Sequence, residues 1–171
     1  DIGSNTNIDS RASKQRKQTS LSYAYSNRNY NHRIMLTHST GLSKKGWAFT
    51  VSGSRRYAGE GYVPGSYYDG WSYFAAIDKK IGEKHLLSLT GFGAPTESGR
   101  QGPAVTEMIK LAGTNFYNPF WGYQNGKVRN ASIAKTHQPY IILTHDFRIS
   151  NTTNLTTAAG YSFGDRSTTA L

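Results

Sequence analysis

The feature of this chain that most constrains its fold is a repeated alternation of apolar and polar residues. From Arg16 onward, runs of about ten residues carry an apolar side chain at every second position. Successive side chains of a β-strand point to opposite faces of the sheet, so each run predicts a strand with one apolar face. We expect seven antiparallel strands, at about residues 16–27, 32–40, 47–57, 71–79, 84–93, 138–149 and 153–164.

The connections between these runs alternate in length after the first hairpin. Short turns are expected at 44–46, 80–83 and 150–152, and long loops at 58–70 and 94–137. The first connection, 27–31, is also short and is the exception. Short turns at one end of a sheet and longer loops at the other are typical of outer-membrane β-barrels.

One segment of the second long loop, residues 103–112, is predicted to be a short helix. Proline stands in its first turn, where a missing N–H costs nothing, and Gly113 can end it. The residues expected to share one face are Val105, Met108, Ile109 and Ala112.

Composition excludes several classes of protein. The 171-residue chain has no cysteine, which excludes disulfides and thiolate metal sites. Nowhere are there 18 consecutive apolar residues, which excludes a membrane-spanning helix but not barrel strands. The formal charge is +10, but the basic residues are spread over strand ends and turns, without a recognition module. Nucleic acid is therefore not an expected partner.

Small hydroxyl residues dominate the predicted polar face. A soluble sheet usually presents Lys, Glu and Arg to water, whereas this face is mostly Ser, Thr, Ala and Gly with a rare Arg33, Asp78 or Asp146. Alternation alone would suit a soluble sandwich equally well. The small polar face and the aromatic residues near strand ends together favour an antiparallel transmembrane β-barrel. These aromatic residues are Tyr23, Tyr25, Trp47, Tyr57, Trp71, Tyr73, Tyr161 and Phe163.

Four stretches carry a resemblance to a known family. They are NIDSRASKQRKQTSLSYAYSNRNYNHRIMLTHSTG (7–41), GWAFTVSGSRRYAGEGYVPGSYYDGWSYFAAIDKK (46–80), HLLSLTGFGAP (85–95) and NPFWGYQNGKVRN (118–130). Over nearly its whole length the chain resembles the N-terminal part of the barrel of TonB-dependent outer-membrane receptors. The resemblance implies a barrel of about 22 strands with a plugged lumen. It also implies that residues 1–15 are the end of the plug and its connector. Residues 16–171 would then be the first barrel strands, with extracellular loops 58–70 and 94–137.

This resemblance implies a fragment of an active nutrient transporter in the outer membrane of a Gram-negative cell. Seven strands cannot complete a bacterial barrel, which has an even number, and a plug with its TonB-contacting segment is missing from the sequence. The implied partners are outer-membrane lipid, the TonB complex through a missing N-terminal region, an unknown nutrient and, in some arrangements, a surface lipoprotein. Sugar, peptide, siderophore and cobalamin all remain open as the nutrient.

Patterns typical of catalysis or metal binding are not found. The five histidines are scattered along the chain, and neither an HExxH spacing nor a GxSxG elbow occurs. In GYQNGK, residues 122–127, the glycine spacing is too short for a phosphate-binding loop, and Asn125-Gly126 predicts a tight turn. We therefore expect no enzymatic activity, no metal and no cofactor.

The predicted loops are rich in aromatic and amide side chains, which suit contact with a ligand. Aromatic faces stack on sugars or apolar groups, and amides supply a few placed hydrogen bonds. Arg55 and Arg56 are adjacent, and the parity of Arg56 with Ser52 and Ser54 assigns it to the inside of the barrel. The candidate ligand-binding residues are Arg56, Tyr62, Tyr67, Asn115, Tyr117, Trp121 and Tyr123. For each of them, packing of the loops on themselves is the competing interpretation.

Two other functions remain open from the sequence. One is a soluble β-rich module that binds glycans, and the other is a passive outer-membrane pore or adhesin barrel without a plug. Detergent-dependence of the folded chain separates the first from a membrane barrel, and the gene region upstream of Asp1 separates the second from a plugged transporter.

Overall fold

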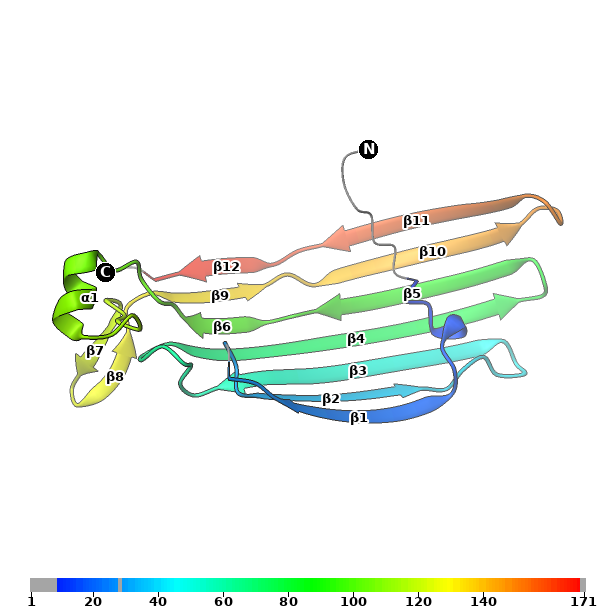
Figure 1. Ribbon diagram of the computed structural model, residues 1–171. Coiled ribbons are helices and arrows are strands. Elements are labelled where there is room, and N and C mark those ends of the chain that lie inside the picture. The colour runs from blue at the N-terminus through cyan, green and yellow to red at the C-terminus, as the bar shows by residue number, and fades with distance from the viewer. Residues whose placement is uncertain (1–8, 28, 170–171) are drawn as a thin grey trace.

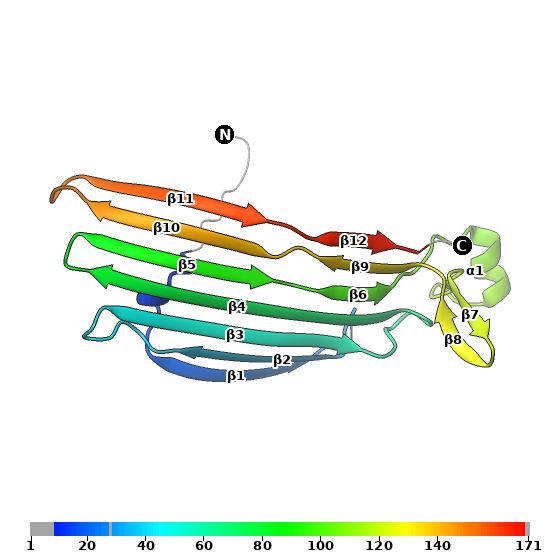
Figure 2. The same cartoon turned by 180° about the vertical axis from the view of Figure 1, so that it is seen from behind.

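A computed structural model describes residues 9–27 and 29–169, which form an antiparallel sheet one layer thick (Figure 1, Figure 2). The strands follow one another in the order β1-β2-β3-β4-β5-β10-β11. This confirms an all-β chain of antiparallel strands. Residues 1–8 of the expected plug end lie outside the described residues. The long strands are β1 (Gln18–Tyr25), β2 (His32–Ser39), β3 (Trp47–Ala58), β4 (Tyr67–Ile81), β5 (His85–Gly93), β10 (Tyr140–Arg148) and β11 (Asn154–Ser162).

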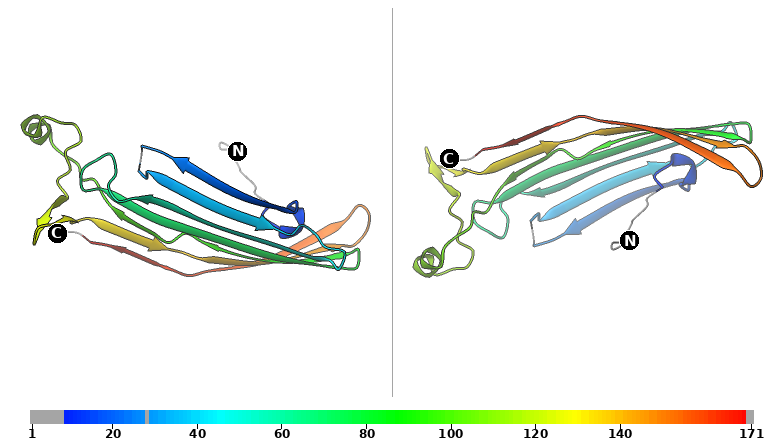
Figure 3. Two further views of the ribbon diagram at one scale, coloured as in Figure 1. Left: turned by 90° about the horizontal axis from the view of Figure 1, so that it is seen from below. Right: turned by 90° about the horizontal axis from the view of Figure 1, so that it is seen from above.

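The sheet is open within the described residues. Its edges are β1 and β11, and each of these is paired with a neighbour along one side only. Figure 3 shows that the sheet is curved rather than flat, as the natural twist of strands requires. The tight turns lie together at one end of the sheet, and helix α1 lies at the other (Figure 1).

Three of the long strands continue past a break, which corrects the expected loop 94–137. β6 (Thr96–Gly99), β9 (Ile133–His137) and β12 (Asp165–Thr168) extend β5, β10 and β11 end to end. β6 pairs with the start of β4, β9 pairs with β6, and β12 pairs with β9. Pro95 and Pro139 mark two of the breaks, because proline has no N–H for the ladder. The unpaired connection is therefore limited to residues 100–132, within which a second small sheet forms.

Two smaller expectations about loops are also settled. The loop predicted at 58–70 is shorter, because β3 ends at Ala58 and β4 begins at Tyr67. The turn predicted at Asn125-Gly126 is confirmed: both residues have positive φ, 53° and 74°, and they join β7 (Trp121–Gln124) to β8 (Lys127–Asn130). Positive φ at both central residues is the requirement of the type I′ hairpin turn.

The expected helix exists but is shorter than predicted. α1 covers Thr106–Ala112 and ends at Gly113, whose φ of 66° places it in the left-handed region that glycine adopts without cost. Its residues are all at least partly exposed, with Val105 and Met108 among the exposed ones. The predicted apolar stripe is therefore not buried against the sheet.

Cross-strand register places each face of the sheet in continuous rows. On one face Val51, Ala75, Gly91, Ile141 and Tyr161 are neighbours across five strands. We call this the outer face. The faces of β5 could not be assigned from the sequence, because Leu86 and Leu87 are adjacent. The register places Leu87 and Leu89 on the outer face and Leu86 on the opposite face. The opposite face, which we call the inner face, carries the row Thr50, Ala76, Thr90, Ile142 and Gly160.

Very few side chains of this sheet are buried. A short 3₁₀ helix, η1 (Ala12–Lys14), lies against the inner face, and its Ala12 contacts buried Ala48 and Ala76. No second layer covers the outer face among the described residues. The accessible surface is 12400 Å² for 18.9 kDa, whereas a compact monomer of that mass exposes about 8,300 Å². The described sheet therefore lacks the core that would hold a soluble domain of this size together.

Candidate functional site

The outer face is an uncovered apolar surface that spans the sheet. Leu143 is 50 % exposed and Val51 is 52 % exposed, although both lie at the centre of the strands. Exposed apolar residues of this face occur on every long strand, and they include Leu21, Leu36, Phe49, Leu89 and Leu155. An exposed apolar patch of this extent on a protein marks a surface that contacts lipid or a partner.

Aromatic residues with a cation over their rings mark both ends of this apolar surface. At the turn end, the ammonium group of Lys79 lies 4.6 Å from the ring centroid of Trp47. At the loop end, the guanidinium of Arg55 lies 4.8 Å from the rings of both Tyr57 and Trp71. Aromatic rings and long basic side chains are the residues that favour a boundary between an apolar phase and water.

The length of the apolar surface can be compared with that of a bilayer. Trp47 and Tyr57 are ten positions apart on β3, which is about 33 Å at about 3.3 Å per residue. A strand tilt of about 40° reduces this to about 25 Å, the height of the apolar band of outer-membrane barrels.

At the level of Tyr57, the loop-end boundary, the outer face becomes charged, since Asp69, Glu97 and Lys135 follow Tyr57 in one cross-strand row. Arg55 donates two hydrogen bonds to Asp69, at 2.9 and 2.8 Å, and these hold the pKa of Asp69 below its ordinary value. Lys135 forms an ion pair of 2.8 Å with Glu97. Glu97 also accepts a hydrogen bond of 2.7 Å from the Tyr67 hydroxyl. These two contacts lower the pKa of Glu97, while burial and the same hydrogen bond raise that of Tyr67.

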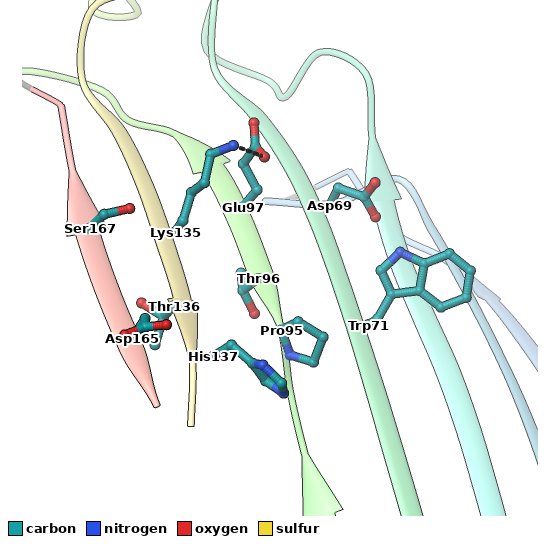
Figure 4. Close-up of a pocket in the computed structure, with 10 residues that line it drawn as sticks. All are labelled: Asp69, Trp71, Pro95, Thr96, Glu97, Lys135, Thr136, His137, Asp165 and Ser167. Carbon is teal, nitrogen blue, oxygen red and sulfur yellow. Dashed lines mark ion pairs between the residues drawn. The ribbon is translucent and has the colours of Figure 1, made fainter. Parts of the chain in front are cut away.

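A hollow of about 440 Å³ lies among these charged residues (Figure 4). Several of its polar groups already have protein partners, since Lys135 pairs with Glu97 and His137 accepts from or donates to the Tyr73 hydroxyl at 2.9 Å. The hollow lies on the outer face, so it does not include Arg56. Tyr67, a candidate from the sequence, is bonded into this charged group.

The inner face is lined with hydroxyl groups that bond one another across strands. Ser39 and Thr50 are joined at 2.9 Å, and Thr37 and Ser52 at 2.7 Å. Because these hydroxyl groups hydrogen-bond to one another, the inner face is a polar wall of small side chains with few charges.

The segment around η1 is attached to this wall by polar contacts. The backbone N–H of Ser13 donates to Asp78 at 2.8 Å, and Asp78 is 0 % exposed. Arg11 forms an ion pair of 2.6 Å with Asp146. The two rare acidic residues of the polar face are therefore those that hold the N-terminal segment. The segment was expected as a connector, and these contacts place its described part across β3, β4 and β10 of the inner face.

Two buried asparagines tie the long loops together. The Asn118 amide donates to the carbonyl of Pro64 at 3.0 Å and accepts from the N–H of Gly102 at 3.1 Å. Asn130 donates to the carbonyls of Gly65 and Arg100, each at 2.8 Å. Loop 59–66 and loop 100–132 are therefore one ordered unit, which lies at the end of the sheet opposite the tight turns.

The loop residues predicted to bind a ligand are divided between packing and exposure. The Trp121 ring lies against Gly65, where an added Cβ would come within 2.1 Å of it, and Tyr62 packs edge-on against Phe116 at 5.9 Å. These two residues stabilise the loops. Asn115 and Tyr123 are exposed and Tyr117 is partly buried. Trp121 and Tyr123 line one shallow hollow beside β7, with a volume of about 350 Å³.

Arg56 lies on the inner face, as its parity with Ser52 and Ser54 predicted. Its guanidinium is 5.6 Å from the ring of Tyr30, and that ring is 6.3 Å from Tyr68. Tyr68 and Tyr62 line a hollow of about 360 Å³ between the sheet and the loops. Arg56 and Tyr62 thus approach one region at the loop end, whereas Trp121 and Tyr123 line another.

Several residues of this region were not singled out from the sequence. Asn118 and Asn130 resemble other loop amides until the structure shows that they are buried. Tyr30 lies in a short turn far from Tyr68 along the chain, and only strand pairing brings them together. His85 and His145, described above as scattered, are also neighbours across β5 and β10, with ring nitrogens 3.1 Å apart. Strand register, which the sequence indicates only approximately, decides the tyrosine and histidine contacts, and loop packing decides those of the asparagines.

Comparisons with known proteins do not assign the chain to a family. A scan of protein-family models and searches of curated sequences and of solved structures found no match. The described residues contain no group of three or more His, Asp or Glu placed to hold a metal ion. No helix in the described part of the chain has the length and apolar character needed to cross a membrane.

Proposed function

We propose that this chain forms part of the wall of an outer-membrane β-barrel, in a TonB-dependent transporter that imports a nutrient. The observation that carries the proposal is the uncovered apolar outer face, which ends at aromatic residues paired with cations on both sides. A surface of this length and composition suits the hydrocarbon layer of a bilayer, with the charged residues Asp69, Glu97 and Lys135 at its loop-end edge.

The large exposed area of the sheet favours a membrane rather than water as its surroundings. The accessible surface is about half as large again as that of a compact monomer of the same mass. At about 25 cal/mol per Å² of apolar surface, leaving such a face in water forgoes a large part of the stabilisation that folding normally supplies. Lipid would cover it without any second protein layer.

The open edges of the sheet support a barrel with further strands. β1 and β11 each present one side without a strand partner among the described residues. In a bilayer, unpaired backbone N–H and C=O groups are so costly that a spanning sheet must close on itself. A chain of this kind therefore needs additional strands from the same protein to complete the wall.

The inner face supports a transporter whose lumen is filled. Its small hydroxyl residues bond one another, and η1 with the adjoining Arg11 already covers part of it. A plug domain that precedes the barrel would continue from this segment. The ordered loops, joined through Asn118 and Asn130, would lie at the extracellular mouth and contact the nutrient.

Association with a membrane can be tested on the full gene product. We expect it to fractionate with outer membranes and to need detergent for solubility. We also expect it to migrate as a compact species in SDS until it is boiled. A full gene product that is monomeric and folded in buffer without detergent would contradict the barrel and favour a soluble glycan-binding module.

Active transport is tested separately. Cells that carry the gene should take up the nutrient only when TonB is present and the membrane is energised. Uptake that persists without TonB would contradict active transport and favour a passive pore, but it would not contradict the proposed barrel.

A further inference from the structure

Two arginines face each other directly on the inner face, close to the loop end of the sheet. Arg33 on β2 and Arg56 on β3 are partners in the cross-strand register, so their Cβ atoms are about 5 Å apart. Like charges in this position repel and destabilise the pair of strands. An anion bound between two such residues would offset this repulsion and stabilise the pair of strands.

Neither arginine has an acidic partner among the described residues, although other basic residues of the chain do. Arg11 is paired with Asp146, and Lys135 with Glu97. The contrast is sharpest with Arg55, next to Arg56 but on the outer face, whose guanidinium is doubly bonded to Asp69. Among the described residues, Arg11, Arg55 and Lys135 are therefore neutralised by nearby acids, whereas Arg33 and Arg56 are not.

The arginine pair includes a donor whose hydrogen bond is not satisfied within the described part of the protein. Within residues 9–27 and 29–169, the buried Nε of Arg33 has no hydrogen-bond partner. One terminal nitrogen of Arg33 contacts the sulfur of Met35 at 3.6 Å, a weak acceptor. Guanidinium groups present several N–H donors in a planar fork that matches carboxylate and phosphate oxygens.

The surroundings leave room for a ligand to approach the pair. The guanidinium of Arg56 lies over the ring of Tyr30, and the ring of Tyr30 lies next to that of Tyr68. Tyr68 lines the hollow of about 360 Å³ under the loops, together with Arg100. A molecule that enters beneath the loops would meet aromatic faces first and the two guanidinium groups next.

We propose that Arg33 and Arg56 form a binding site for an anionic group, a carboxylate or a phosphate, of the ligand that this protein takes up. The inference rests on the proposed function, because it treats the inner face as the path of the nutrient. It narrows the nutrient to molecules that carry at least one such group, and the tyrosines would contact the rest of the ligand.

The test measures binding of simple anions to the full gene product in detergent. Isothermal titration with citrate and with inorganic phosphate should detect binding, and a neutral trisaccharide should not bind at this site. Arg33→Gln and Arg56→Gln should each weaken citrate binding about ten-fold or more, since each removes charge-assisted hydrogen bonds. Arg56→Lys should retain part of the affinity, because lysine keeps the charge but loses the fork.

Arg166→Gln is a matched control. Arg166 lies in the same cross-strand row of the inner face as Arg56, through Gly70, Thr96 and Thr136. It is four strands away, which is about 19 Å at about 4.8 Å per strand. The substitution removes the same charge and should leave citrate binding unchanged.

The outcomes separate this site from the proposed function. If the protein is a membrane barrel but citrate and phosphate bind equally to wild type, to Arg56→Gln and to Arg33→Gln, the anion site is wrong and the transporter stands. Equal loss in Arg166→Gln would also overturn the site, because it would reflect net charge alone. Each variant is first checked for the compact, heat-sensitive species in SDS, so that misfolding is not read as lost binding.

Discussion

The backbone N–H of Ser13 donates a hydrogen bond of 2.8 Å to a carboxylate oxygen of Asp78, 65 residues later in the chain. Asp78 lies near the turn end of β4 and is 0 % exposed, and the neighbouring Ala12 is equally buried. A buried carboxylate in a sheet needs such a donor, and a segment without regular structure needs such an anchor. This contact therefore fixes the N-terminal segment on the inner face.

Removing this anchor should release the segment. Asp78→Ala leaves the N–H of Ser13 without its acceptor in a buried place, which costs about 1–3 kcal/mol. We expect faster tryptic cleavage between residues 11 and 17, with the sheet otherwise intact. Asp165→Ala, on exposed β12, is the control and should cleave at the wild-type rate; equal rates for both variants would show that the contact does not hold the segment.

A charge introduced on the outer face should distinguish lipid from water as its surroundings. Val51 lies midway along the apolar surface, so Val51→Lys should reduce the free energy of folding into lipid vesicles by about 2–4 kcal/mol. Ser22→Lys, on the inner face of β1, should change it by less than about 1 kcal/mol. If Val51→Lys folds as well as wild type, the outer face does not contact lipid.

Gly65 and Gly82 provide a test of how tightly the loops are joined. Both have positive φ, so alanine at either position incurs about 1–2 kcal/mol of backbone strain. At Gly65 the new Cβ would also collide with the Trp121 ring, whereas at Gly82 nothing lies within 4 Å. Gly65→Ala should therefore change Trp fluorescence and increase hydrogen exchange in loop 59–66 well beyond Gly82→Ala. Similar effects of the two substitutions would contradict the packing of Trp121 on Gly65.

The buried amides should account for the order of the long loops. Asn118→Ala removes acceptor and donor bonds from four backbone groups of two loops, for a loss of about 2–4 kcal/mol of local stability. Limited proteolysis within residues 100–132 should become faster, while exposed Asn115→Ala should have no effect. Unchanged cleavage in Asn118→Ala would mean that other contacts hold the loops together.

The charged end of the outer face predicts an acid-sensitive contribution to stability. The folded pKa values of Asp69 and Glu97 lie below their ordinary values, so folding is favoured when both are ionised. The contribution is complete above the unfolded pKa of about 4 and is lost as the pH falls through the folded values. The melting temperature of wild type should therefore fall between pH 7 and pH 3. The double variant Asp69→Asn, Glu97→Gln should lack this fall. An equal drop in the variant would assign the acid sensitivity to other groups.

Part of the fold could be predicted because it depends on local patterns. Alternation around Phe49, Leu143 and Leu155 placed the strands and their outer faces, and Asn125-Gly126 marked its hairpin turn. The face of Arg56 followed from parity with Ser52 and Ser54. In contrast, β6, β9 and β12 carry few apolar residues, and their pairing depends on neighbouring strands that extend alongside them. The long loop was therefore overestimated.

The composition of the candidate site depended on long-range contacts. Tyr62 and Trp121 were candidates for ligand contact, with packing of the loops on themselves as the competing interpretation. The structure packs Tyr62 on Phe116 and Trp121 on Gly65, as the packing interpretation had it. The pair Arg33 and Arg56 was not identified, because parity assigned both to the inner face but only the register of β2 and β3 places them opposite each other.

The sequence by itself determined that this chain forms antiparallel strands with one apolar and one polar face, because side-chain direction in a strand follows from residue parity. Only the tertiary structure decided that nothing within the described chain covers the apolar face. It also decided that Asp78 and Asp146 hold the N-terminal segment, while Arg33 and Arg56 remain opposite each other without an acid. These features arise from strand register and chain crossing, which join residues far apart in the sequence and leave no mark in the local pattern.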